Sequence, residues 1–204
     1  LMRTRLSKSE RRDQILKKAR QILVKQGLAK TEMEDIRLAC GISRGGLYHH
    51  FSNKRAVLDA LAEEEVGLLA EALDDKDASP IIVLLQNGSS HLGADAGVHS
   101  ALQTLEERLD YISALEQAFS AILKDAVCAR MGDFVRDDIN AEHVAELFMT
   151  VNAHINRREI LGHWSSAQAA GFAATSLEAL APLLKSPEEL NPILLDLKQR
   201  ASSS

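Results

Sequence analysis

Apolar residues recur at intervals of three and four along almost the whole chain, and this spacing constrains the fold more than any other feature of the sequence. A period near 3.6 residues is typical of an α-helix that buries one face, whereas a half-buried strand alternates with a period of two. No segment shows the β-branched alternation of a strand, and only four prolines occur in 204 residues. The sequence therefore predicts an all-α protein.

The chain begins with two periodic segments separated by a short loop. Residues 9–26 carry an apolar stripe with a basic opposite face, and Gly27 is expected to end this helix. Thr31 and Glu34 have the spacing of a capping box at the start of a second helix, which should end at residues 40–41. We expect its inward face to be formed by Met33, Ile36 and Ala39.

The stretch GISRGGLYHHFSNK, residues 41–54, places two adjacent glycines inside a third, short helix over residues 44–50. Each glycine costs about 1 kcal/mol relative to alanine in a helix interior. Ser43 as the N-cap and an apolar contact between Ile42 and Leu47 are expected to offset part of this cost. Two short helices joined by a tight turn predict a helix-turn-helix, whose second helix enters the major groove of DNA.

The side chains of this short helix suit a DNA reader. Arg44 can donate two hydrogen bonds to the O6 and N7 atoms of a guanine. Tyr48 and His49 can donate to phosphate oxygens, and Lys54 adds a cation at the start of the next helix, where backbone N–H groups already favour an anion. Phe51, in contrast, is expected in the core.

Charge divides the chain into two parts. Residues 1–58 contain 14 Lys and Arg against 5 Asp and Glu, a net charge of +9, whereas residues 59–204 contain 10 against 24, a net charge of −14; together they give the −5 of the whole chain. A basic head on an acidic body predicts a polyanionic partner for the head alone. We therefore expect a DNA-binding domain over residues 1–58 and a second domain over residues 59–204.

The stretch RGGLYHHFSNKRAVLDAL, preceded by TEMEDIRLACGIS, resembles the head of the TetR family of bacterial transcriptional repressors. The capped second helix, the Gly-Ile-Ser turn, the Leu-Tyr-x-His-Phe motif and the lysine after it all fall at the family's spacing. Gly46 stands where family members often carry Thr, Ala or Ser, and Arg37 replaces a residue that is commonly small. The resemblance implies DNA contacts at Thr31, Arg44, Gly45, Gly46, Tyr48, His49, His50 and Lys54.

The resemblance also implies that the body is a helical domain that binds an inducer and forms a homodimer. Helical periodicity predicts body helices over residues 80–86, 98–104, 105–130, 141–163 and 166–184. The last two are joined by a tight turn, and an antiparallel pair can form a four-helix dimer interface. Small and large apolar residues on this pair are candidate interface residues, unless they pack within one chain: Phe148, Ile155, Trp164, Ala169, Phe172, Ala173, Leu177 and Leu180.

A pocket for a small-molecule inducer is expected among the fourth to eighth helices, with apolar walls and few polar groups. Six residues are candidate ligand contacts, although each is also compatible with an ordinary surface or hydrogen-bonded polar residue: Gln86, His91, His99, Gln103, Tyr111 and Asn152. The chemical identity of the inducer does not follow from the sequence.

Other classes of function have little support in the sequence. There is no catalytic motif, no metal-ligand spacing, no fingerprint of a cofactor site and no apolar run as long as a membrane span, and a cytoplasmic location is expected. We expect a dimeric repressor that binds a palindromic operator in double-stranded DNA and is released by an inducer, with activation left open. The alternative is a helical protein that binds small molecules but not DNA.

Overall fold

The computed structural model describes residues 6–75, 79–90 and 97–203, and within them the regular structure is helical apart from one isolated β-bridge between Val135 and Leu184. The prediction of an all-α fold is confirmed. The α-helices are α1 Lys8–Gln26, α2 Met33–Cys40, α3 Arg44–Tyr48, α4 Lys54–Leu73, α5 Pro80–Ser90, α6 Leu105–Ile122, α7 Lys124–Met131, α8 Ala141–Ile160, α9 Ser166–Leu180 and α10 Asn191–Ala201. Short 3-10 helices cover Val98–Ala101 (η1), Ala181–Leu183 (η2) and Pro187–Leu190 (η3).

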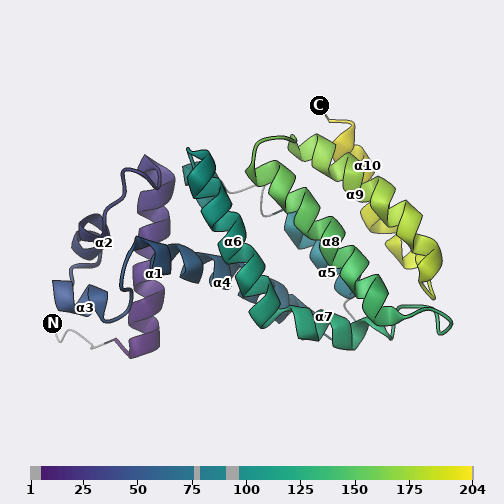
Figure 1. The fold of residues 1–204 in the computed structure, drawn as a ribbon, viewed down its shortest axis with the longest axis horizontal. Helices are drawn as coiled ribbons and strands as arrows, with labels where there is room; N and C mark the ends of the chain where they lie inside the picture. Colours follow the sequence, from purple (N-terminus) through teal and green to yellow (C-terminus); the bar gives the residue numbers. More distant parts are fainter. Residues whose placement is uncertain (1–5, 76–78, 91–96, 204) are drawn as a thin grey trace.

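The helices form a small head and a larger body (Figure 1). The head contains α1, α2 and α3 at one end of an elongated molecule, and α4 leads from it into the body. There α6, α8, α9 and α10 lie beside one another in that order, while α5 lies behind α8 and contacts α4, α8 and α9. The ends of the chain are far apart.

The ends of α1 follow the expected local chemistry. Ser7 is its N-cap: the Ser7 hydroxyl accepts a hydrogen bond from the Glu10 backbone N–H, and the Glu10 carboxylate accepts one from the Ser7 N–H. Gly27 ends the helix with φ 85°, as the sequence predicts. The buried face consists of Ile15, Leu16, Ala19 and Leu23.

The start of α2 differs from the prediction. Glu32, not Thr31, precedes the helix, and its backbone N–H donates to the carboxylate of Asp35 over 2.9 Å. Thr31 is fully buried. Its hydroxyl donates to the carbonyl oxygen of Gly27 at 2.7 Å and does not cap α2. On the inward face Ile36 is buried as expected, but Ala39 is exposed; Cys40 takes the core position one residue later.

Several body helices also end at positions other than those predicted. The backbone of α5 continues through the Asn-Gly-Ser-Ser stretch to Ser90. The single helix expected over residues 105–130 is interrupted at Leu123, which is fully buried between α6 and α7. After Ser186 the chain forms η3 and then α10, which lie beyond the last of the helices predicted above.

Two apolar clusters make up the core, and α4 contributes to both. Residues 57–62 of α4 pack with α1, α2, α3, η1 and part of α6, whereas Val66, Leu69 and Leu73 belong to the core of the body. The predicted division after residue 58 therefore falls within one continuous helix. That division stays a prediction, since the head cluster includes side chains from the body.

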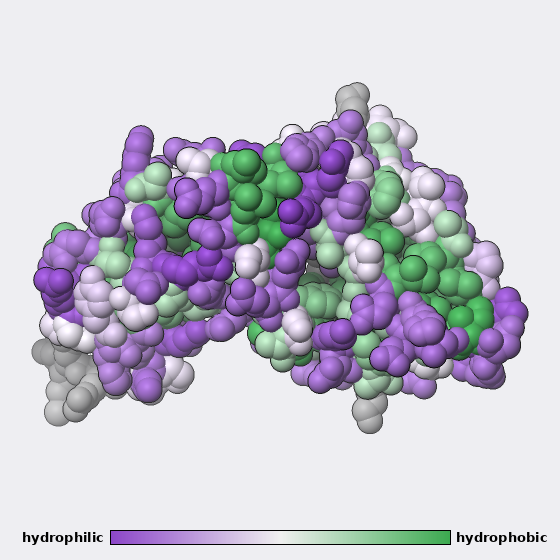
Figure 2. Space-filling view, viewed as in Figure 1, coloured by the Kyte–Doolittle hydropathy of each residue, from purple (hydrophilic) through white to green (hydrophobic). Residues whose placement is uncertain are grey.

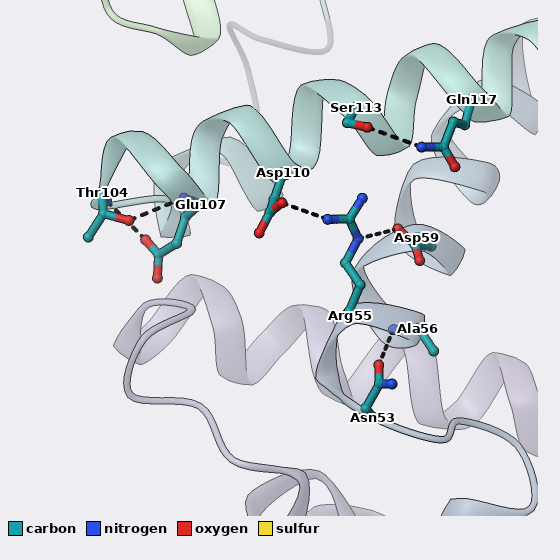
Figure 3. Close-up of polar contacts among 9 residues, drawn as sticks. All are labelled: Asn53, Arg55, Ala56, Asp59, Thr104, Glu107, Asp110, Ser113 and Gln117. Atoms are coloured by element: carbon teal, nitrogen blue, oxygen red, sulfur yellow. Dashed lines mark hydrogen bonds and ion pairs between the residues drawn. The ribbon is translucent and has the colours of Figure 1, made fainter.

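Polar contacts fix the junction between head and body (Figure 3). The Arg55 guanidinium in the first turn of α4 donates to Asp59 on the same helix and to Asp110 on α6, both at 2.7 Å. The backbone N–H of Leu28 donates to the carbonyl of Ala101 at 3.0 Å. Exposed ion pairs contribute at most about 1 kcal/mol, so Arg55 orients α4 against α6 more than it stabilises the fold.

Gly27 lies at this junction in a conformation, φ 85° and ψ 159°, that is essentially restricted to glycine. A Cβ atom there would lie 2.7 Å from Nε2 of Gln103. We expect Gly27→Ala to lower the free energy of unfolding by about 1–3 kcal/mol because the backbone must shift or stay strained. Urea denaturation measures this.

Gly67→Ala is the matched control. Gly67 lies inside α4, and a Cβ atom added to it meets nothing within 4 Å. Alanine should therefore stabilise the protein by about 0.5–1 kcal/mol. Equal effects of the two substitutions would contradict the assigned strain at Gly27.

Candidate DNA-binding surface and ligand cavity

The short helix α3 is fixed to the head by its apolar residues and presents its polar face to solvent. Leu47 is fully buried and Phe51 is 3% exposed, whereas Tyr48 is 43% exposed. The Ser43 hydroxyl accepts a hydrogen bond from the Gly46 N–H at 3.1 Å. The expected N-cap, the core position of Phe51 and the outward position of Tyr48 are all confirmed.

Gly45 is exposed on this helix, and a Cβ atom there would meet nothing within 4 Å. At Gly46 a Cβ atom would lie 3.2 Å from the Ser43 hydroxyl, so the two glycines differ. Packing within the chain therefore gives no reason for a glycine at position 45, although alanine would favour the helix by about 1 kcal/mol.

Arg44 and Tyr48 form an exposed pair on α3. The guanidinium carbon of Arg44 lies 5.6 Å from the centroid of the Tyr48 ring, within the range of a cation–π interaction. The contact limits the conformations of the Arg44 side chain without using the hydrogen-bond donors of its guanidinium group. Arg44 therefore keeps the planar set of donors that reads guanine.

A groove between the first turn of α1 and α3 adds basic residues to this surface. Lys8 and Arg11 line it together with Gly46, His49 and His50. Burial, followed by the positive charges of His49, Lys8, Arg11 and Arg12, lowers the pKa of His50. The sequence prediction did not include Lys8 and Arg11 in this surface, although two basic residues spaced by three at the start of a capped helix were a signal for it.

Two of the predicted DNA contacts, Thr31 and Lys54, have structural roles in the head. Thr31 cannot reach DNA with its hydroxyl, because that group is buried. The ammonium group of Lys54 donates to the carbonyl oxygens of Leu28 and Thr31, each at 3.0 Å. Lys54 thus holds the loop between α1 and α2, because its ammonium group is the hydrogen-bond partner of two backbone carbonyls there. These two bonds use two of the three N–H donors of the ammonium group, so the DNA contact of Lys54 stays a prediction.

Other cations of the head are paired with carboxylates. Arg12 binds Glu63 at 3.0 Å and Arg20 binds Glu64 at 2.6 Å, so α1 is connected to α4. Arg37 binds Glu34 and also donates to the carbonyl of Ile42. Lys8, Arg11 and Arg44 have no carboxylate partner among the described residues.

The body contains a cavity of about 330 Å³ between α4, α6 and α8, in the region predicted for an inducer pocket. Figure 2 shows a hollow in the surface between α6 and α8. Most of the wall surface is apolar, and eight of the eighteen lining residues are apolar: Val66, Leu69, Ile112, Leu115, Phe119, Met149, Ala153 and Ile160. This volume is near the lower end of the range for small-molecule sites, about 300–1,000 Å³.

Two of the six predicted ligand contacts, His99 and Asn152, line this cavity. Tyr111 lies behind the wall, is fully buried and donates to the Glu65 carboxylate at 2.6 Å. Burial and the negative charge of Glu65 raise the pKa of Tyr111, so its phenol stays protonated. Gln103 lies outside the cavity, against Gly27. His91 and the side chain of Gln86 are outside the described part of the structure.

Most of the predicted dimer-interface residues are buried within one chain. These are Phe148, Ile155, Ala169, Ala173 and Leu177, and their assignment as interface contacts is wrong. Phe148 and Ile155 lie on α8, which packs against α5, α7 and α9. On α9 the neighbours include α10, and a Cβ atom at Gly171 would be in contact with Ala201 at 3.6 Å. The small residues of α9 thus accommodate a helix of the same chain.

The other three predicted interface residues, Trp164, Phe172 and Leu180, are at least partly accessible. The ring centroids of Trp164 and Phe172 are 5.0 Å apart, and His154 lies within 5.5 Å of both. Leu147 on α8 is 48% exposed. Figure 2 shows apolar surface over α8 and α9 on the visible face. We call Leu147, His154, Trp164 and Phe172 the aromatic face.

Neither a metal cluster nor a membrane span is found in the part of the chain that the structure describes. No three His, Cys, Asp or Glu side chains in those residues are grouped to hold a metal ion. None of the described helices has both the length and the hydropathy to cross a bilayer.

Comparison with known proteins agrees with this arrangement. The profile of the bacterial regulatory proteins of the tetR family matches residues 15–61. The chain is 34% identical to the transcriptional regulator TtgR of Pseudomonas putida over 83 residues, 39% of this chain and 40% of TtgR. It is 31% identical to the transcriptional repressor KstR2 of Rhodococcus jostii over 153 residues, 66% of this chain and 72% of KstR2.

The solved structure of Salmonella enterica GusR shares the fold, with a TM-score of 0.61 at 22% identity, over 88% of this chain and 98% of that one. The fold and the exposed helix-turn-helix define a class, the DNA-binding transcriptional regulators. The chain belongs to the tetR family of bacterial regulatory proteins.

Proposed function

We propose that this protein is a dimeric transcriptional repressor that binds a palindromic operator and is released from it by a small molecule. The observation that carries the DNA-binding part is the surface of α3. Arg44, Gly45 and Tyr48 are exposed there, and Lys8 and Arg11 lie beside them without a carboxylate partner among the described residues. Bases are contacted by α3, while the first turn of α1 binds phosphate.

Two-fold symmetry of the operator follows from a two-fold dimer. Reading helices of paired helix-turn-helix units insert into the major groove about 34–36 Å apart, one turn of DNA. The aromatic face supplies the apolar surface for the dimer contact, with Phe172 at its centre as the aromatic anchor. The inducer binds in the cavity between α4, α6 and α8, and it changes the separation of the heads.

Selection of duplexes from a random pool tests the DNA-binding proposal. A palindromic consensus supports it; a failure to enrich any sequence favours the alternative, a helical small-molecule-binding protein without DNA-binding activity. Arg44→Ala should cost about 1–3 kcal/mol at one base pair and relax the preference for guanine there.

Lys8→Ala is the comparison, since it removes a charge and no base contact. It should weaken all duplexes alike and reduce the slope of log affinity against log salt by about 1 per lost phosphate contact. If both substitutions lower specific and non-specific binding by the same factor, the division between base and phosphate contacts is wrong.

Gly45→Ala separates stability from DNA binding. Alanine fits the free protein and should raise its free energy of unfolding by about 1 kcal/mol. It should nevertheless weaken operator binding, because a methyl group prevents close approach of the α3 backbone to the DNA. Gly67→Ala, distant from the head, should also stabilise the protein but leave DNA affinity unchanged; unchanged affinity in Gly45→Ala contradicts the close approach.

Phe172→Glu tests the dimer. A carboxylate in an apolar interface should weaken the dimer by about 2 kcal/mol or more, roughly thirtyfold in the dissociation constant. Sedimentation equilibrium measures this constant. Leu68→Glu is the control, since Leu68 is 52% exposed on α4, outside the aromatic face. A wild-type protein that is monomeric at micromolar concentration, or a dimer that both variants leave intact, excludes this interface.

A further inference from the structure

The cavity between α4, α6 and α8 has two chemically different parts. At the rim, exposed charged residues from α6, α7 and α8 are already paired: Lys124 binds Glu146 at 2.8 Å, and Arg157 lies 3.9 Å from Glu116. These are the two Lys or Arg residues of the cavity lining. An anionic ligand would therefore have to displace a carboxylate before it gained a cationic partner.

The inner part is less exposed and rich in hydrogen-bond acceptors. The Glu65 carboxylate accepts from Tyr111 and lies 3.5 Å from Nε2 of His99, too far for a well-formed hydrogen bond. Both ring nitrogens of His99 and the Oδ1 atom of Asn156 are buried without a hydrogen-bond partner. An amide oxygen and a carboxylate offer lone pairs, and so does an imidazole nitrogen that carries no hydrogen.

Asn152 adds an independent observation. It is only 5% exposed and lines the cavity from α8, and its side chain has no hydrogen bond to the described residues. The fully buried amide atom without a partner is Oδ1 of Asn156, one turn further along α8, and an unsatisfied buried group of this kind costs about 1–3 kcal/mol. Both amides line the cavity, where a bound molecule can supply the partner.

We propose that the ligand of this cavity is a compact, mainly apolar molecule with one hydrogen-bond-donating head, a hydroxyl or an amine, and no negative charge. The head binds between Glu65 and Asn152, and the apolar part contacts Leu69, Leu115 and Phe119. This inference rests on the proposed inducer function and specifies the chemistry of the same site.

Exclusion of an anion follows from the carboxyl groups around the inner part. A carboxylate head would face Glu65 at short range, while the lysine and the arginine of the lining are already paired with carboxylates. Near the end of α8, burial raises the pKa of Glu159 to about 7, against the opposing effects of Ser166 and His99. A second negative charge nearby would raise the cost of burying Glu159 further, whereas a donor or a cation lowers it.

Three probes with one apolar skeleton test the proposal: 4-phenylbutan-1-ol, 4-phenylbutylamine and 4-phenylbutanoate. We expect the alcohol and the amine to bind the full-length protein at least about tenfold more tightly than the carboxylate in isothermal titration calorimetry, the size of effect of one hydrogen bond to a charged group. A carboxylate that binds as tightly as the alcohol overturns the proposal. So does a lack of binding by all three at millimolar concentration.

Two variants locate the head of the ligand. In the wild-type protein the negative charge of Glu65 should favour the amine over the alcohol. Glu65→Gln retains the acceptor for Tyr111 but removes the charge, so it should abolish that preference and reduce discrimination against the carboxylate. Asn152→Leu should weaken the alcohol about tenfold. Gln117→Leu is the matched control, because Gln117 is on the exposed side of α6, bonded to Ser113, and does not line the cavity (Figure 3). Equal affinities in all three variants would overturn the assigned position.

Operator binding is measured in the same samples, which separates this inference from the proposed function. Probe binding with the expected selectivity but without release of DNA supports the ligand class and contradicts an inducer role. Operator binding by a protein that prefers the carboxylate contradicts the ligand class and leaves the regulator intact.

Discussion

The packing of α4 against α6 is the interaction on which the rest of the molecule depends. Tyr111 on α6 is fully buried, and its hydroxyl is satisfied by Glu65 on α4. A phenol at this depth must have a partner, so the pair fixes the register of the two helices. From that register, α4 supplies Leu61 to the head core and Leu69 to the cavity wall.

Head and cavity therefore share structure. Ile112 on α6 and Ile160 at the end of α8 line the cavity, and both belong to the apolar cluster that includes the head. Close-packed interiors respond to small changes in volume, so a molecule that displaces these side chains also changes the packing against α1. Arg55 and Asp110 join the same two helices at the surface, in the first turn of α4.

Local sequence signals predicted the head well. Ser43 caps α3, Gly27 ends α1 and Phe51 is in the core, because each of these positions is decided by the chemistry of a few neighbouring residues. The prediction of the capping box at the start of α2 was wrong, because two overlapping pairs of residues have the spacing and side chains that a capping box needs. Thr31 with Glu34 and Glu32 with Asp35 both fit a capping box, and the hydrogen bond of Thr31 to Gly27 selects the second pair.

The sequence by itself determined the all-helical class, the helix-turn-helix and the basic head, because periodicity, caps and charge are properties of short segments. Only the tertiary structure decided which surfaces remain free. It packed α10 along α9 and directed the ammonium group of Lys54 toward the loop between α1 and α2. It also brought His99 and Asn152 to one cavity from distant parts of the chain. The physical reason is that burial depends on which helices pack together, and an apolar or polar side chain does not specify its partner.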